Sequence, residues 1–158
     1  MVEATVCFFM RNGTTVPEVL LARKLTGFGA GNRNGYGGHI ETKETPEETT
    51  IREIKEECRV EISENDLKLL GRILIYRGPR ESVDLYVFTC SNSDSDFSDS
   101  DEMADPQWFS EDQLPISEMN EGDELWIHHV LKGIRFGTCV LYKATDGSMV
   151  FVSPTLRV

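Results

Sequence analysis

The amino-acid sequence predicts an α+β fold, in which a mixed β-sheet carries one acidic helix in the first half of the chain and a second helix near its end. Short segments rich in β-branched and aromatic residues predict the strands, and a capped helical pattern after a glycine-rich segment predicts the first helix. The chain has 158 residues, of which 39% are hydrophobic, and no internal repeat. We therefore expect residues 1–158 to form a single domain.

The predicted elements are separated by turns that glycine and proline mark. Strands are expected at residues 5–10, 19–24, 67–76, 82–90, 138–143 and 149–153, with a short strand or turn at residues 105–110. Turns are expected at residues 11–13, 78–79 and 146–147. One helical turn is expected at residues 111–114, before Pro115, and a helix at residues 123–132, before Gly133.

The first helix is predicted to begin after Thr45, which suits the N-cap position. Pro46 suits the first helical position, and Glu48 completes a Thr-x-x-Glu capping box. Apolar side chains recur at helical spacing and give the helix one stripe for the core, namely Ile51, Ile54 and Cys58.

Three glutamates share another face of this helix, because Glu53, Glu56 and Glu57 are spaced at i, i+3 and i+4. Each adjacent pair of like charges there costs roughly 0.2–0.5 kcal/mol, and only Arg52 and Lys55 are close enough to offset them. One interpretation is a solvated acidic surface. The other is a site for a hard divalent ion, Mg²⁺ before Zn²⁺, because the donors are oxygens and no Cys/His pair has metal-ligand spacing.

The acidic composition excludes some classes of partner. The chain has 16 Lys and Arg against 27 Asp and Glu, which gives a formal net charge of −11. This balance argues against binding to a nucleic acid polymer or to an anionic membrane surface, because both require basic side chains on the protein. A small phosphate-bearing molecule stays compatible with the charge when a metal and a few basic groups accompany it.

The N-terminus and the cysteines predict a cytoplasmic protein. The first residues enter a strand pattern at once, without a basic leader or cleavage site, and no segment approaches the roughly 20 apolar residues of a membrane span. The cysteines lie among apolar residues without a CxxC pair, so we expect reduced core residues and no disulfide at Cys7, Cys58, Cys90 and Cys139.

Two segments have a biased composition. Residues 27–38 contain six glycines and form either a flexible loop or a backbone that lets a phosphate group approach closely. Residues 91–101 form an acidic low-complexity run, which we expect to be a mobile, solvated loop. His128 and His129 point about 100° apart on a helix, so we expect packing or surface positions rather than one shared metal.

The stretch from Gly38 to Val60 resembles the Nudix box. In that motif a Gly precedes a Glu by six positions, and Arg-Glu follows eight positions after that Glu, then an aliphatic residue, any residue, Glu-Glu, any residue, Gly and an aliphatic residue. The matching positions are Gly38, Glu44, Arg52, Glu53, Ile54, Glu56, Glu57 and Val60. Arg59 departs from the pattern by replacing the Gly of a left-handed helix end, and we expect it to strain that end by about 1 kcal/mol.

The resemblance covers nearly the whole chain. Residues 27–31, 34–38, 100–103, 108–109, 113–115 and 155–158 are similar to the animal MutT-homologue type of Nudix hydrolase, which cleanses oxidised purine nucleoside triphosphates. This likeness implies the Nudix α/β/α sandwich around a mixed β-sheet.

The resemblance also implies roles for single residues. It assigns Mg²⁺, or Mn²⁺, to Glu53, Glu56, Glu57, Glu102 and the Gly37 carbonyl, with Arg52 orienting the glutamates and Glu102 joining the metal site or acting as general base. For the substrate it assigns Lys24 to the phosphates, and Phe28, Asn34, Met103, Asp123, Trp126 and Tyr142 to the base pocket.

Two positions depart from the animal enzymes, which carry Trp and Asp where this chain has Asn120 and Gly122. The resemblance implies that the Trp stacks on the base and that the Asp pairs with the counterpart of Asp123. A stacking contact of roughly 1–3 kcal/mol and a polar partner are therefore missing here. The hydrolytic residues are complete, but a preference for 8-oxoguanine does not follow.

The function implied is a Mg²⁺-dependent pyrophosphohydrolase that cleaves oxidised or modified purine nucleoside triphosphates to the monophosphate and pyrophosphate, as nucleotide pool sanitation by a monomer. A first alternative is a Nudix hydrolase of a nucleoside diphosphate linked to a sugar or a second nucleoside. A second alternative is a non-catalytic, nucleotide-sensing Nudix module. Intact box glutamates favour an enzyme over such a module.

Overall fold

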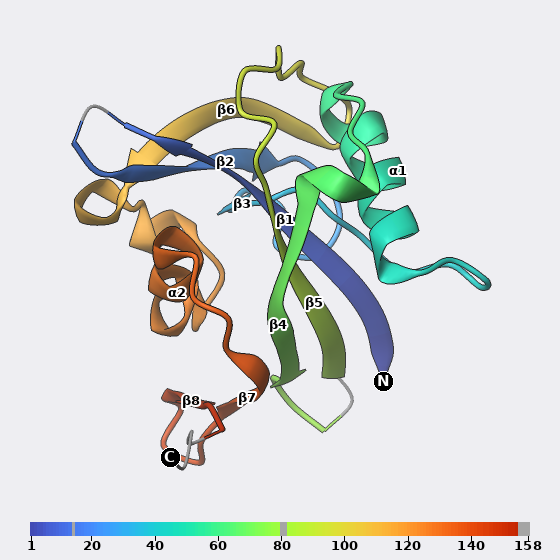
Figure 1. Ribbon diagram of the computed structural model, residues 1–158. Helices are drawn as coiled ribbons and strands as arrows, with labels where there is room; N and C mark the ends of the chain where they lie inside the picture. The colour runs from blue at the N-terminus through green and yellow to red at the C-terminus, as the bar shows by residue number, and fades with distance from the viewer. Residues whose placement is uncertain (14, 80–81, 155–158) are drawn as a thin grey trace.

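The computed structural model describes residues 1–13, 15–79 and 82–154 and confirms the α+β prediction (Figure 1). The strands are β1 (Val2–Asn12), β2 (Pro17–Lys24), β3 (Arg33–Asn34), β4 (Leu67–Tyr76), β5 (Ser82–Cys90), β6 (Met103–Ser110), β7 (Gly137–Lys143) and β8 (Met149–Val152). The helices are α1 (Pro46–Cys58) and α2 (Ile127–Lys132), with 3-10 turns η1 (Glu64–Asp66), η2 (Glu111–Gln113), η3 (Ile116–Glu118) and η4 (Asp123–Leu125). No helix in the described part of the chain is long and apolar enough to cross a membrane.

The strands form one mixed sheet in the order β3-β2-β1-β5-β4-β7-β8, with β6 paired to β2. The pairs β1–β5 and β4–β7 are parallel, and the other strand pairs are antiparallel. Both parallel pairs need a crossover connection, and the chain segments that contain α1 and α2 supply these crossovers. The sequence therefore places a helix in each crossover.

The two helices cover opposite faces of the sheet. Successive side chains of β1 point to opposite faces, so Phe9 packs in one hydrophobic layer with Ile54 and Cys58 of α1. Phe8 packs in the other layer with Trp126, next to the residues of α2. A mixed sheet between two helical layers is the predicted α/β/α sandwich, and Figure 1 shows α1 and α2 on either side of the strands.

The local sequence signals of α1 act as predicted. The hydroxyl of Thr45 accepts a hydrogen bond from the Glu48 N–H at 3.1 Å, which satisfies one of the free N–H groups at the helix start. The predicted apolar stripe faces the core, with Ile54 and Cys58 fully buried and Ile51 half-buried. This burial fixes the rotation of α1, so that Glu53 and Glu57 lie along the flank of the buried stripe.

Arg59 ends α1 in the left-handed conformation, with φ 63°, and its N–H bonds to the Lys55 carbonyl at 3.1 Å. A Cβ is unfavourable there, so Arg59→Gly is expected to raise the free energy of unfolding by about 1 kcal/mol. Chemical denaturation would measure the change. Arg59→Ala is the control, because it removes the charged side chain but keeps the Cβ. An equal gain in both variants would contradict the conformational explanation.

Two predicted elements are wrong in part. Arg11 and Asn12 extend β1 by pairing with β2, so the turn expected at residues 11–13 lies further along the chain. The helix expected at residues 123–132 is divided into η4 and α2, because Trp126 leaves the helical conformation and packs edge-on against Phe8, with ring centroids 5.9 Å apart. Residues 105–110, by contrast, were expected as a strand or turn and lie in strand β6, which confirms that prediction.

The acidic run at residues 91–101 lacks helix and strand, as expected, but its middle is attached to the core. The Phe97 ring contacts Phe9 at 4.7 Å, and the Ser98 N–H bonds to the Cys58 carbonyl at 3.0 Å. These contacts dock the run against the C-terminal end of α1. The mobility of this run stays a prediction. Residues 155–158, part of the resemblance to the MutT-homologue enzymes, lie outside the described residues.

The cysteines and the paired histidines occupy packing positions. Cys7, Cys58, Cys90 and Cys139 are buried free thiols. The His129 ring lies between Phe136 and Phe151, with centroids 5.9 and 6.1 Å away. Packing of His129 was predicted, and the geometry confirms it.

Candidate active site

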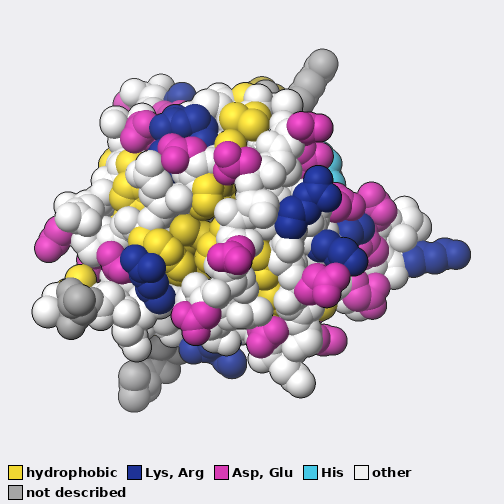
Figure 2. All heavy atoms as spheres, turned by 90° about the horizontal axis from the view of Figure 1, so that it is seen from above, with side chains coloured by type: hydrophobic (Ala, Val, Ile, Leu, Met, Phe, Trp, Pro, Cys, Tyr) yellow, Lys and Arg dark blue, Asp and Glu magenta, His cyan; other side chains and the backbone are white. Residues whose placement is uncertain are grey.

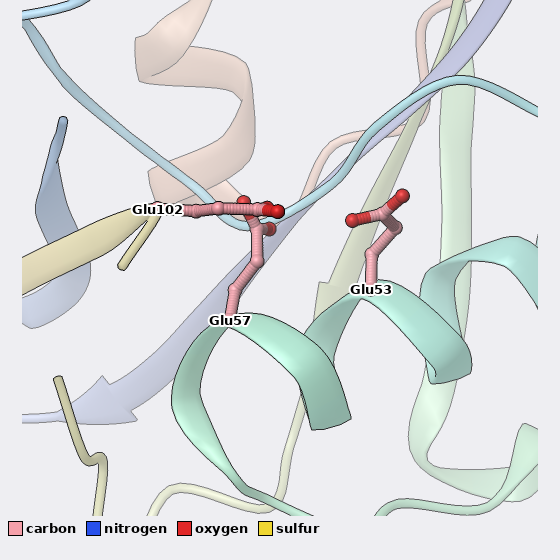
Figure 3. A group of neighbouring side chains, drawn as sticks. All are labelled: Glu53, Glu57 and Glu102. Carbon is pink, nitrogen blue, oxygen red and sulfur yellow. The ribbon is translucent and has the colours of Figure 1, made fainter. Parts of the chain in front are cut away.

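Three carboxylates from two elements form an acidic cluster, defined here as Glu53, Glu57 and Glu102. Glu53 and Glu57 are one helical turn apart on α1, and Glu102 directly precedes β6 and reaches toward Glu57 (Figure 3). One oxygen of each side chain lies within 4.8 Å of the other two. The Glu102 carbonyl accepts a hydrogen bond from the Leu25 N–H at 2.8 Å, which fixes this corner of the chain beside the end of β2.

Burial sets the electrostatics of the acidic cluster. Glu57 is only 3% exposed, and this burial raises its pKa to about 8, while the Gly37 N–H, 2.8 Å from its carboxylate, opposes the rise. The neighbouring charges of Glu53 and Glu102 raise that pKa further. Burial also raises the pKa of Glu53, against the effect of Arg52. The cluster is therefore short of positive charge.

The Arg52 side chain is hydrogen-bonded to glutamates on α1 and in the loop before it. Its guanidinium donates two hydrogen bonds of 2.9 Å to the Glu44 carboxylate and one of 3.0 Å to Glu53. Arg52 also lowers the pKa of Glu44. The two-point contact with Glu44 fixes the guanidinium plane, so the third bond fixes the Glu53 carboxylate. Figure 2 shows acidic and basic side chains intermixed on the right, where the loop before α1 projects.

The glycines before α1 are required by close packing. A Cβ on Gly38 would lie 2.6 Å from the carboxyl carbon of Glu53, and a Cβ on Gly37 would lie 2.7 Å from the Thr5 carbonyl carbon. The Gly38 carbonyl accepts a hydrogen bond from the Thr5 N–H at 2.9 Å, which ties this segment to β1. The Nudix-box glycine thus allows the backbone to pass directly beside the cluster.

Glu56 is not brought into the acidic cluster. It lies 60° further around the helix than Glu53, its side chain is 51% exposed, and its carboxylate lies 3.4 Å from the Arg52 guanidinium. Glu53 and Glu57 therefore share one face of the helix, as the spacing predicts, whereas Glu56 lies at the exposed edge of that face. Its assignment as a metal ligand stays a prediction.

The cluster fits a hard divalent cation. Its donors are all carboxylate oxygens, which suit Mg²⁺ or Mn²⁺ better than soft metals. Burial alone leaves Glu57 holding a proton near neutral pH, and a bound cation would replace that proton. The Gly37 carbonyl, the remaining predicted ligand, receives no hydrogen bond from the residues the structure describes.

A pocket of about 340 Å³ adjoins the acidic cluster and shares Glu57 with it. Its wall contains six of the seven predicted substrate residues, which are Lys24, Phe28, Asn34, Met103, Asp123 and Trp126. Tyr142 is the exception: it is 38% exposed on β7 and does not line the pocket, whereas its neighbour Leu141 is fully buried. Alternation along the strand explains the difference, because adjacent side chains point to opposite faces.

Several residues of the pocket wall were not predicted from the sequence. Arg77 is the one with the clearest chemistry, and it follows β4 directly. It continues the face of Ile75, also in the wall, so the two-residue period of the strand could have indicated it. Thr5, Val83 and Leu85 are among the residues that β1 and β5 contribute to the wall. These strands lie side by side only in the folded sheet.

Two buried polar groups line the pocket. Asp123 is 3% exposed, and burial raises its pKa to about 7, while Arg77 lowers that pKa and Glu124 raises it. The indole N–H of Trp126 is buried and has no hydrogen-bond partner among the described residues. A buried polar group without a partner is costly, so the Trp126 N–H is suited to a polar ligand in the pocket, and the buried Asp123 carboxyl lies in the same wall.

The raised pKa of Asp123 predicts a pH-dependent stability. Between pH 4 and 7 the folded protein keeps the proton that the unfolded chain, with the ordinary pKa of 3.8, has lost. The free energy of unfolding should therefore fall as the pH rises through this window, by on the order of 4 kcal/mol in total. Asp123→Asn should remove this part of the slope, measured by denaturation across the pH range. Asp112→Asn, a control at an exposed position, should retain this part of the slope. If the free energy of unfolding depends on pH equally in the wild type and in Asp123→Asn, the prediction is wrong.

An α/β/α sandwich with a carboxylate cluster on a helix that follows a glycine segment defines the class of protein. The protein-family model described as NUDIX domain matches residues 1–130 of the sequence. The chain therefore belongs to the Nudix family. Two relatives are named "Oxidized purine nucleoside triphosphate hydrolase". The one from Danio rerio is 40% identical over 120 residues, 75% of each chain. The one from Mus musculus is 34% identical over 141 residues, 89% of this chain and 86% of the relative.

Solved structures share the fold. The MutT protein from Bacillus halodurans superposes with a TM-score of 0.71 at 20% identity, over 99% of this chain and 100% of that chain. The NUDIX domain of Shewanella oneidensis NrtR, crystallised with ADP ribose, has a TM-score of 0.67 at 16% identity, over 84% and 87% of the two chains. At these identities the likeness concerns the fold alone.

Proposed function

We propose that this protein is a Mg²⁺-dependent pyrophosphohydrolase that cleaves oxidised or modified purine nucleoside triphosphates to the monophosphate and pyrophosphate. The observation that carries the proposal is the position of Glu57, which belongs both to the acidic cluster and to the wall of the pocket. The names of the two relatives, from zebrafish and mouse, support the substrate class. The proposed role is sanitation of the cytoplasmic nucleotide pool by a monomer.

In the proposed mechanism, Glu53, Glu57 and Glu102 hold Mg²⁺, with the Gly37 carbonyl and Glu56 as further ligands. When bound, the metal neutralises charge developing on the phosphate oxygens and acidifies the attacking water. A carboxylate of the acidic cluster accepts the proton from this water as it attacks phosphorus and pyrophosphate leaves.

Other residues of the site position the substrate. Arg52 keeps Glu53 in place through its hydrogen bond of 3.0 Å. Lys24 lies in the pocket wall close enough to Glu57 to lower its pKa, which suits an ammonium group that binds the phosphates next to the cluster. Asp123 and Asn34 supply polar contacts for the base, and Phe28, Met103 and Trp126 supply apolar surface.

The test is incubation of the purified protein with Mg²⁺ and a panel of normal, oxidised and methylated purine deoxynucleoside triphosphates. Release of pyrophosphate is measured and ranked by kcat/KM. We expect turnover that requires the divalent ion, with modified purines preferred over normal ones. The same panel without Mg²⁺, in chelator, is the matched control.

Each other outcome has its own meaning. If nucleoside diphosphates linked to a sugar or a nucleoside yield monophosphate without free pyrophosphate, the first alternative is correct and the proposed substrate class is wrong. Metal-dependent nucleotide binding without any product would favour the nucleotide-sensing module. Absence of turnover for all nucleotides would overturn the proposal.

A further inference from the structure

The pocket has a basic side chain beside each of two carboxylates. The positive charge of Lys24 opposes the rise in the pKa of Glu57 on α1 that burial causes. The charge of Arg77 does the same for Asp123 of η4. All four residues line the same pocket. Lys24 therefore belongs to the end at the acidic cluster, and Arg77 belongs to the end where Asp123 and Trp126 lie.

Phe28 orients Arg77. The guanidinium carbon of Arg77 lies 5.5 Å from the centroid of the Phe28 ring, a cation–π contact between the turn after β4 and the glycine segment after β2. A guanidinium that stacks on a ring face keeps its in-plane N–H groups available for hydrogen bonds. The Phe28 ring is 65% exposed, so this pair lies at the mouth of the pocket.

The two groups at this end impose opposite requirements on a bound base. Arg77 has only hydrogen-bond donors, whereas the Asp123 carboxyl accepts hydrogen bonds, with both oxygens when it is ionised and with its carbonyl oxygen when it holds a proton. A 6-oxopurine such as guanine offers acceptors at O6 and N7 and donors at its ring N–H and exocyclic amino group. A 6-aminopurine such as adenine places an amino donor where guanine has O6, so its donor would face the donors of Arg77.

We propose that Arg77 is a specificity-determining residue that, together with Asp123, selects 6-oxopurine over 6-aminopurine nucleotides. The proposal rests on the proposed function in one respect, namely that the pocket receives the base of a nucleotide. A well-formed contact between arginine and a guanine edge discriminates by about tenfold or more.

The first test compares kcat/KM for dGTP and 8-oxo-dGTP with kcat/KM for dATP and 2-hydroxy-dATP. Arg77→Met should lower the guanine-to-adenine ratio by about tenfold, because kcat/KM falls for the guanine nucleotides and holds or rises for the adenine nucleotides. Arg77→Lys keeps the charge but lacks the planar guanidinium, so its guanine-to-adenine ratio should lie between those of the wild type and Arg77→Met. Arg135→Met, a change of the same type at an exposed position outside the pocket wall, should leave the ratio unchanged. An unchanged ratio in Arg77→Met, or an equal fall for both bases, would overturn the proposal.

The second test separates this proposal from the proposed function. Binding of dGMP and dAMP is followed by quenching of tryptophan fluorescence, since Trp126 lines the pocket. If the wild type hydrolyses no triphosphate, the proposed function fails, and the ratio of the two Kd values decides the role of Arg77. The wild type should favour dGMP, and Arg77→Met should lose about tenfold of that preference. Equal ratios in both proteins, or binding of neither nucleotide, would overturn the proposal.

Discussion

Replacing Glu57 with glutamine is expected to lower kcat for nucleotide hydrolysis by roughly 10²–10⁴-fold while preserving the fold. The amide has the shape of the carboxylate and can still accept the hydrogen bond that the Gly37 N–H donates to Glu57 at 2.8 Å. It cannot bind a hard cation with full charge or accept the proton of the attacking water. The loss should therefore appear in the chemistry and in metal binding.

Two measurements check this expectation. The first is kcat at saturating substrate, and the second is the rise in Tm that Mg²⁺ causes in the absence of substrate. Glu48→Gln, the same change at an exposed position in the first turn of α1, should keep both at the wild-type level. Full activity of Glu57→Gln, or an undiminished rise of Tm with Mg²⁺, would remove Glu57 from the metal site. Glu56→Gln in the same series tests whether the rim glutamate is also a ligand.

The parts of this molecule that the sequence predicts well are those that depend on local interactions. The start of α1 depends on Thr45 and its neighbours within one turn, and its orientation depends on the spacing of Ile54 and Cys58. With that face buried, Glu53 and Glu57 had to lie along its edge, about 60–100° around the helix from Ile54. The conformational strain expected at Arg59 is likewise local, and its φ of 63° agrees.

The parts that the sequence predicts poorly depend on contacts between distant segments. The sequence grouped Glu56 with Glu53 and Glu57, whereas in the structure Glu56 lies at the rim and pairs with Arg52, which Glu44 holds across the loop before α1. The break of the late helix at Trp126 depends on its contact with Phe8 on β1.

The pocket wall shows the same limit. Arg77 and Phe28 meet only after β4 and the glycine segment are folded against the same sheet. Tyr142 was assigned to the pocket by family likeness, but the position of β7 beyond β4 leaves its side chain outside the wall. The metal ligands and substrate contacts that the resemblance implies therefore stay predictions, including those that the fold brings together.

The second large effect is expected for Gly38→Ala, which should lower kcat by about 10²-fold or more with little change in stability. The new Cβ would lie 2.6 Å from the carboxyl carbon of Glu53, a contact that cannot persist. The backbone at Gly38 is tied to β1 by the hydrogen bond from the Thr5 N–H, whereas the Glu53 side chain can rotate. Glu53 should therefore move out of the acidic cluster and lose its bond to Arg52.

Two further glycine variants make this explanation testable. At Gly78 a Cβ meets nothing within 4 Å, so Gly78→Ala should change neither activity nor stability. At Gly37 the Cβ would meet the backbone of Thr5 at 2.7 Å, and backbone of a central strand cannot rotate away, so Gly37→Ala should lower the Tm as well as the activity. Loss of stability in Gly38→Ala as large as in Gly37→Ala would mean that Gly38 serves the fold. Full activity in Gly38→Ala would mean that hydrolysis does not require Glu53 where the structure has it.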